Sequence, residues 1–267
     1  MRTLLAALVL AACQPASLQT TAVPTPRTLP AAEPGAPDRS ISSASSARSP
    51  GEPEPPMPPS RRFEHDVMVR YHMHGNLDLV RAIERLLIRG KLNETREMAR
   101  LIAEAPAGND LDLGAWATEA AEVRQRAQAL AAAPGIDEAC RREAQLAEAC
   151  AGCHVETKIQ PEFRHPPALP PDLDTIEARM ARHRWAADRL WEGLIGADDE
   201  PWHAGLAVFA QAPIHWKAFD ERKLLARRLQ QLANEARQRS TTDSLGDRAR
   251  IYGEMLVTCA ACHTANP

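Results

Sequence analysis

Aromatic side chains are scarce in this chain of 267 residues, at 4 % of the total. A close-packed core must therefore be filled by aliphatic side chains or by a large apolar cofactor. The formal net charge is −3, which excludes the strong basic field that binds nucleic acid. Ala, Leu, Arg and Glu dominate the last three-quarters of the chain. This composition favours helices over strands and predicts an all-α fold.

The chain lacks a long apolar run at its start. Residues 4–12 are apolar and follow Arg2, but nine residues span only about 14 Å as a helix, too short to cross a bilayer. The run leads into Cys13 and resembles the lipobox of bacterial lipoproteins, which implies export, acylation of Cys13 and anchoring to a membrane by lipid on the periplasmic or cell-envelope side. The alternative is an ordinary signal peptide in which Cys13 is incidental.

Residues 14–60 are rich in proline, serine and alanine. Twelve of the 22 prolines lie there. Such a segment cannot bury enough apolar surface to fold, so we expect a disordered tether.

Helical periodicity begins near residue 63. Apolar spacing predicts helices over 64–89, 93–105 and 111–133, and a fourth that starts near Asp137. Gly90, Pro106 and Pro134-Gly135 mark the ends of the first three.

This four-helix unit repeats in two registers. The shorter register places Leu87-Ile88 on Leu194-Ile195, and the longer register, greater by two positions, places Val123 on Leu232. Matching helices at a fixed spacing indicate an internal duplication with a two-residue insertion. We therefore expect two domains, 61–165 and 166–267.

Each repeat ends in a Cys-x-x-Cys-His motif, Cys150-Ala-Gly-Cys153-His154 and Cys259-Ala-Ala-Cys262-His263. Two thiols at this spacing reach the two vinyl groups of one porphyrin, and the following imidazole ligates its iron. The motifs therefore predict two covalently bound haems c, attached through Cys150, Cys153, Cys259 and Cys262. His154 and His263 are the expected proximal iron ligands.

Three other interpretations compete: thioredoxin-like redox pairs, a zinc site that joins both pairs, and structural disulfides. The first requires alternating strands and helices, and the second is disfavoured by the long gap and by the His after each pair. The count of six cysteines fits haem attachment, with one lipid site, four thioethers and one remaining Cys140. Cys140 aligns with Ala249, so we expect it to be a small core residue.

The order of helices first and haem motif last resembles class II cytochromes c, the cytochrome c′ family of four-helix bundles. The likeness covers about residues 63–160 and 173–264. It implies two tandem four-helix-bundle-like haem domains, in which the first helix covers the far face of each haem.

That face raises the question of the sixth iron ligand. The shorter register aligns Met73 with Met180, and thioether ligation would raise the potential. The longer register aligns His74 with His183, and two imidazoles would lower it. We prefer the methionines because the shorter register needs no gap in the first two helices, although both could be plain core residues.

The leading functional hypothesis is one-electron transfer between redox partner proteins of the cell envelope. Binding or sensing of nitric oxide or carbon monoxide is the alternative, if the iron lacks a sixth protein ligand. We expect no enzyme, since the sequence shows no paired acid and base, nucleophile constellation or glycine-rich phosphate loop. We also expect no nucleic-acid partner.

Overall fold

The computed structural model describes residues 59–105, 116–163, 167–211, 220–239 and 244–265, which all belong to the unit Pro55–Pro267. Within these ranges the chain is helical and forms no strand, so the predicted all-α class is confirmed. Cys13 and nearly all of the expected tether lie outside the described residues.

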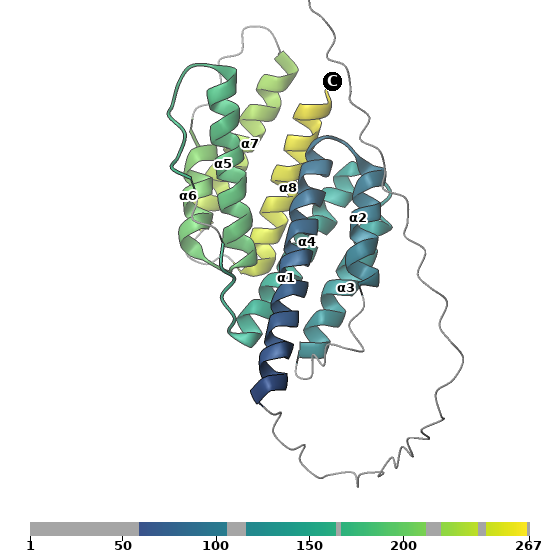
Figure 1. The fold of residues 1–267 in the computed structure, drawn as a ribbon. Helices are drawn as coiled ribbons and strands as arrows, with labels where there is room; N and C mark the ends of the chain where they lie inside the picture. The colour runs from purple at the N-terminus through teal and green to yellow at the C-terminus, as the bar shows by residue number, and fades with distance from the viewer. Residues whose placement is uncertain (1–58, 106–115, 164–166, 212–219, 240–243, 266–267) are drawn as a thin grey trace, which may run out of the picture. The chain divides into compact units, whose positions relative to one another are not determined.

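Eight helices are formed by the residues that the structure describes (Figure 1): α1 (Pro59–Ile88), α2 (Leu92–Glu104), α3 (Ala117–Ala131), α4 (Ile136–Thr157), α5 (Ile176–Ile195), α6 (Asp199–Phe209), α7 (Asp220–Arg239) and α8 (Leu245–Thr264). Helices α5, α6, α7 and α8 correspond in order to α1, α2, α3 and α4, so the four-helix unit occurs twice. Each Cys-x-x-Cys-His motif lies in the last helix of its repeat.

The turn after the first helix is the same in both repeats. Gly90 has a φ of 70°, and the N–H of Lys91 donates to the Leu86 carbonyl at 2.9 Å. Ala197 has a φ of 50°, and the N–H of Asp198 donates to the Gly193 carbonyl at 3.0 Å. Both are Schellman turns, which stop a helix with one left-handed residue. The shorter register places Gly90 on Ala197, so this turn confirms that register for α1 and α5.

The start of the last helix fixes the longer register. Gly135 is the N-cap of α4 and Ser244 is the N-cap of α8, and the longer register places one on the other. The Ser244 side chain accepts from the Asp247 N–H, and the Asp247 carboxylate accepts from the Ser244 N–H, forming a capping box. This box satisfies N–H groups that the first turn leaves unpaired. The two-residue insertion therefore lies between the first turn and the last helix.

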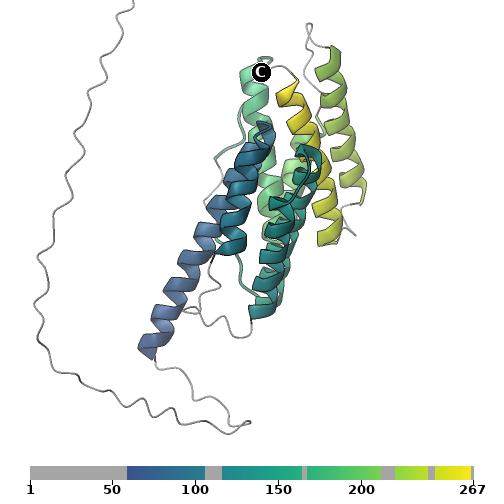
Figure 2. The same cartoon turned by 90° about the vertical axis from the view of Figure 1, so that its right-hand side faces the viewer.

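The two repeats pack against each other through their last helices. The most extensive helix contact is between α4 and α8, and α8 also packs on α1 while α4 packs on α5. Figure 1 shows α8 beside α1, and Figure 2 shows the same helices from the side. Buried apolar side chains of both repeats form one continuous core. The end of each motif helix is therefore held by the other repeat as well as by its own.

Helices α5 and α6 approach closely at Gly193. A Cβ atom added there would lie 2.5 Å from the backbone nitrogen of Trp202, an atom that cannot rotate away. We expect Gly193→Ala to lower the free energy of unfolding by about 1–3 kcal/mol, the usual cost of overpacking. Gly75→Ala is the control, because nothing lies within 4 Å of a Cβ atom there. Guanidinium denaturation should show the control unchanged or more stable, and equal stability of both variants would contradict this packing.

Candidate functional site

The first motif lies in the last two turns of α4. Cys150, Cys153 and His154 are separated by three and four residues, so they share one face of the helix. The helix ends just beyond them, where Lys158 adopts a left-handed conformation with a φ of 57°. The end of α4 thus presents two thiols and an imidazole together.

The imidazole of His154 is oriented by the second repeat. Its Nδ1 lies 3.0 Å from the carbonyl oxygen of Ile195 at the end of α5. A carbonyl can only accept, so Nδ1 carries a proton, and in the neutral ring Nε2 then has the free lone pair. Histidines that bind metals are typically oriented in this way, by a hydrogen bond from the second ring nitrogen to a carbonyl or carboxylate. The arrangement fits an iron ligand.

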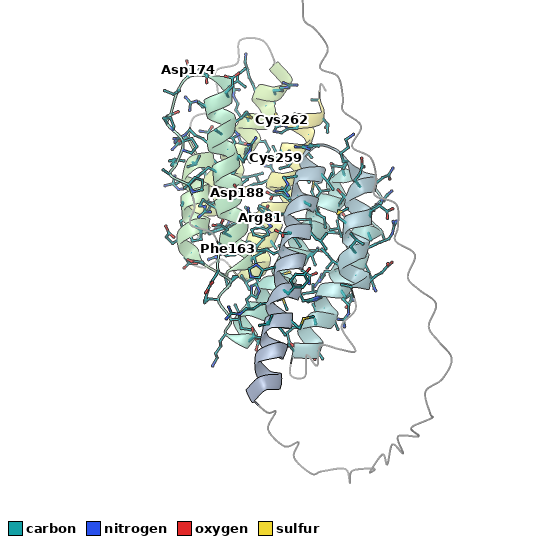
Figure 3. All side chains as sticks on the ribbon, in the orientation of Figure 1. Arg81, Phe163, Asp174, Asp188, Cys259 and Cys262 are labelled. Carbon is teal, nitrogen blue, oxygen red and sulfur yellow. The ribbon has the colours of Figure 1, made fainter. Side chains whose placement is uncertain are left out.

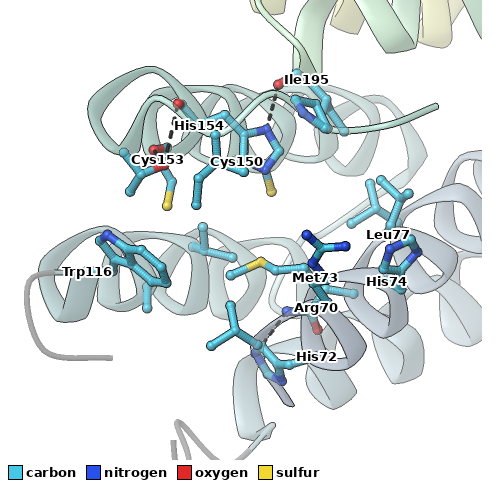
Figure 4. A pocket seen from close by; sticks show the side chains of 18 of the residues that line it. Arg70, His72, Met73, His74, Leu77, Trp116, Cys150, Cys153, His154 and Ile195 are labelled. Carbon is cyan, nitrogen blue, oxygen red and sulfur yellow. Dashed lines mark hydrogen bonds between the residues drawn. The ribbon is translucent and has the colours of Figure 1, made fainter. Parts of the chain in front are cut away.

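A cavity of about 390 Å³ opens beside this face of α4, within the range of cofactor pockets. Its lining is mostly apolar and comes from helices α1 to α4, from residues that flank them, including 159–162 after α4, and from Ile195 of α5. Figure 4 shows Met73 of α1 and Trp116 pointing toward the thiols of Cys150 and Cys153. The structure thus brings Met73 of the first helix together with a motif that lies three helices further along the chain.

Several polar residues also reach this cavity. His72 is half-buried, and its Nε2 lies 3.2 Å from the Asn76 side-chain nitrogen. Burial, followed by the charge of Arg124, lowers the pKa of His72. Arg70 and Arg124 add positive charge to the lining, while the side chain of His74 is exposed.

The second motif lies at the end of α8, where Cys259, Cys262 and His263 share a face. Across from it, the His183 ring of α5 is half-buried and meets the Phe209 ring edge-on at 5.3 Å between centroids. Burial, and then the charge of His263, lower the pKa of His183 to about 4. The His183 imidazole is therefore neutral at neutral pH, as iron ligation requires. Met180 lies one turn earlier and is also half-buried.

The structure bears on the competing interpretations of the cysteines. None of the five described cysteines is in a disulfide. Burial raises the pKa of the Cys150 and Cys259 thiols to about 12, whereas the reactive cysteine of a thioredoxin-like motif has a lowered one. Among the described side chains, no three of His, Cys, Asp or Glu are grouped to hold a metal ion. Cys140 is fully buried in the core, in accord with its expected role.

Two features of the site were missed by sequence reasoning. A backbone carbonyl such as that of Ile195 leaves no signal in the sequence. The second is a group of buried acids near both motifs, Glu84 and Glu143, which are 6 % and 0 % exposed. A charged residue in a helix ordinarily indicates a solvated face, so the burial of these two was not predicted.

Comparisons of the chain with protein-family models, with curated proteins and with solved structures found no match. Nothing in the described part of the chain is both long and apolar enough to be a membrane-spanning helix.

Proposed function

We propose that this chain is a dihaem c-type cytochrome that carries single electrons. The observation that supports it most is the position of His154, beside Cys150 and Cys153 at one wall of an apolar cavity, with Nδ1 bound to a carbonyl. Thioether bonds from the two thiols would hold the porphyrin there, and His154 Nε2 would bind its iron. Iron in a porphyrin supplies reversible one-electron chemistry when bound.

The second haem would be held in the same way by Cys259, Cys262 and His263. The two units would then be tandem four-helix-bundle-like haem domains similar to class II cytochromes c, with their motif helices packed against each other. Arg70 and Arg124 carry the charge to pair with the propionate carboxylates of the first haem. The electron partners would be redox proteins of the cell envelope, and acylated Cys13 would tether the protein to a membrane.

We propose that the two irons have different sixth ligands. Met73 is the ligand for the first, since it is half-buried in the cavity while the His74 side chain is exposed. For the second, both Met180 and His183 come from the matching helix α5. His183 is favoured because its ring lies in a buried environment under the influence of His263. In the shorter register it occupies the position of Asn76, which lines the first cavity.

Mass spectrometry of the mature protein from a haem-competent host tests this function. We expect a mass increase equal to two haems, a free Cys140 and an acylated N-terminal Cys13. The reduced spectrum should be low-spin and unchanged by carbon monoxide. A colourless protein would contradict the proposal, and a high-spin spectrum that shifts with carbon monoxide would instead favour gas binding.

A further inference from the structure

Three buried polar side chains meet where the two repeats join. Glu84 of α1 and Tyr252 of α8 are 6 % and 1 % exposed, and the Tyr252 hydroxyl donates to Glu84 Oε1 at 2.9 Å. Glu143 of α4 is fully buried, and neither of its carboxyl oxygens has a hydrogen-bond partner among the described residues. An ionised carboxylate in such a place would be strongly disfavoured. These three residues are called the acid cluster below.

The repeat places two members of the acid cluster, Glu143 and Tyr252, at the same distance along the chain from the two Cys-x-x-Cys-His motifs. Tyr252 is the partner of Glu143 in the longer register, and α4 and α8 touch here. A Cβ atom added at Gly253 would lie 3.2 Å from the Arg141 Cα atom. Glu143 precedes Cys150 by seven residues, and Tyr252 precedes Cys259 by seven. Seven residues are two helical turns, about 10 Å, along the same face. The acid cluster is therefore within electrostatic reach of both haem attachment points.

The cations near Glu84 do little to neutralise a negative charge on its carboxylate. Two cations of α1, Arg81 and Arg85, act on Glu84, together with one anion of α5, Asp188. Arg81 is itself bound by two carboxylates of α5, at 3.7 Å from Asp188 and 3.3 Å from Glu192 (Figure 3 labels Arg81 and Asp188). The side chain of Arg85 is exposed. Its charge is therefore screened by water.

Around Glu143 the facing ionisable groups are also acids. They are Glu84 of α1, Tyr252 of α8, and the thiols of Cys140 and Cys150 on α4. Glu192, the remaining carboxylate nearby on α5, is paired with Arg189 as well as Arg81. A negative charge added in this region would therefore raise the pKa values of these acids, because few cations lie nearby to offset it.

Burial sets the protonation of the two carboxyls. It raises the pKa of Glu84 to about 7, partly offset by the Tyr252 hydrogen bond. Burial, followed by the charge of Glu84, raises the pKa of Glu143 well above its ordinary value. At neutral pH Glu143 is thus a neutral acid, and Glu84 is close to half-protonated. The charge of Glu84 disfavours ionisation of Glu143, so the two carboxyls do not ionise together at neutral pH.

We propose that Glu84 and Glu143 form a buried proton-binding site, which gains a proton when the chain accepts an electron and loses it on oxidation. The inference rests on the proposed dihaem function. A bound haem would supply the one-electron change, with the electron coming from a redox partner, and hydronium would give its proton to the Glu84 carboxylate. One O–H bond of hydronium breaks, one O–H bond forms on Glu84, and water is released. The electron and the proton cancel in net charge, so the buried region stays neutral.

Potentiometric titration of the haem-loaded full chain at a series of pH values tests the site. Raising the pH leaves Glu84 as an anion, which opposes electron uptake. The affinity for one electron should therefore fall up to tenfold per pH unit near neutrality, which is about 59 mV for a one-electron couple. A reduced-minus-oxidised infrared spectrum should also show the carbonyl stretch of a newly protonated carboxylic acid.

Two variants assign the proton to this cluster. Glu84→Gln keeps an acceptor for the Tyr252 hydroxyl and cannot titrate, so the pH dependence and the infrared band should be lost. Glu143→Gln should keep both, because Glu143 is already a neutral acid at neutral pH, and this variant therefore separates the titration of Glu84 from that of Glu143. The matched control is Glu254→Gln, a carboxylate of α8 paired with Arg141 at the surface, which should behave as wild type. The wild-type slope and band test the site even if one variant fails to fold.

Each other outcome overturns the inference. Two haems with potentials that do not change with pH would contradict the site and leave the dihaem function intact. A pH dependence that survives in both Gln variants would assign the proton elsewhere, and a potential set by K⁺ or Ca²⁺ concentration would indicate a cation in its place. A chain that binds no haem fails at the earlier step and overturns the proposed function with it.

Discussion

Replacing Met73 with alanine is expected to lower the midpoint potential of one haem and to leave the other unchanged. A thioether sulfur favours ferrous iron, and its loss admits water or leaves the position open. We expect a shift on the order of 0.1 V, within the range of about 0.8 V that axial ligands span. Spectroelectrochemical titration would measure it, and the sulfur-to-iron charge-transfer band of the ferric protein should disappear.

His183→Ala is expected to raise the midpoint potential of the second haem, a change opposite in sign to that expected for Met73→Ala. Loss of an imidazole ligand removes a donor that favours ferric iron, so the potential of this haem should rise while the first stays in place. The opposite signs make the pair of variants a sharp test. A general loosening of the fold would shift both haems together in either variant.

Matched controls exist for both proposed ligands. Met98 of α2 is a partly buried methionine packed against the core, and His203 of α6 has a buried Nε2 without a hydrogen-bond partner among the described residues. Met98→Ala and His203→Ala should leave both potentials unchanged. If Met180→Ala changes the potential of the second haem and His183→Ala does not, both irons have a thioether as sixth ligand. If His74→Ala changes the potential of the first haem, His74 is the sixth ligand there, as the longer register predicts.

The elements that sequence could predict are those with local causes. Gly90 and Pro134-Gly135 end helices through their own backbone preferences, and the structure ends α1 and begins α4 within two residues of the expected positions. Both repeat registers were also visible, because each is fixed by a local turn or cap. The first cavity followed in part, since the helical face that carries Met73 is set by the periodicity of α1.

The elements that sequence could not predict depend on contacts between the repeats. The Ile195 carbonyl reaches His154 only because α5 ends against α4. Every residue has a backbone carbonyl, so no residue type in the sequence predicts this contact. The longer register paired His74 with His183, but the turns at Gly90 and Ala197 align His183 with Asn76. The acid cluster had one usable signal, the alignment of Glu143 with Tyr252 seven residues before each motif.

The pH dependence of stability gives the largest expected effect of the acid cluster. The pKa of Glu84 is about 7 in the folded chain, against an ordinary value of 4.5. Between these values the folded state holds a proton that the unfolded state has released, so Glu84 makes the protein less stable as pH rises. Its contribution is fully favourable below pH 4.5 and is lost as pH passes 7. The difference between the two pKa values corresponds to about 3 kcal/mol.

The measurement is the difference in free energy of unfolding between Glu84→Gln and wild type, from guanidinium denaturation at pH values from about 4 to 8. His183 must be separated from this, because its lowered pKa makes stability rise with pH over an overlapping range, from about 4 to 6.5. Subtracting wild type from the variant cancels His183, which both proteins contain. The Gln variant should therefore gain about 3 kcal/mol relative to wild type across the interval.

Glu254→Gln serves again as the control, and its difference from wild type should not follow the same curve, since its carboxylate is paired with Arg141 at the surface. Glu143→Gln should change stability with the same sign as Glu84→Gln, because burial opposes ionisation at both positions. A Glu84→Gln difference that is constant with pH would mean that Glu84 ionises normally in the folded chain. Water or a cation would then have to reach the junction of the repeats, and the proton-binding site would lose its physical basis.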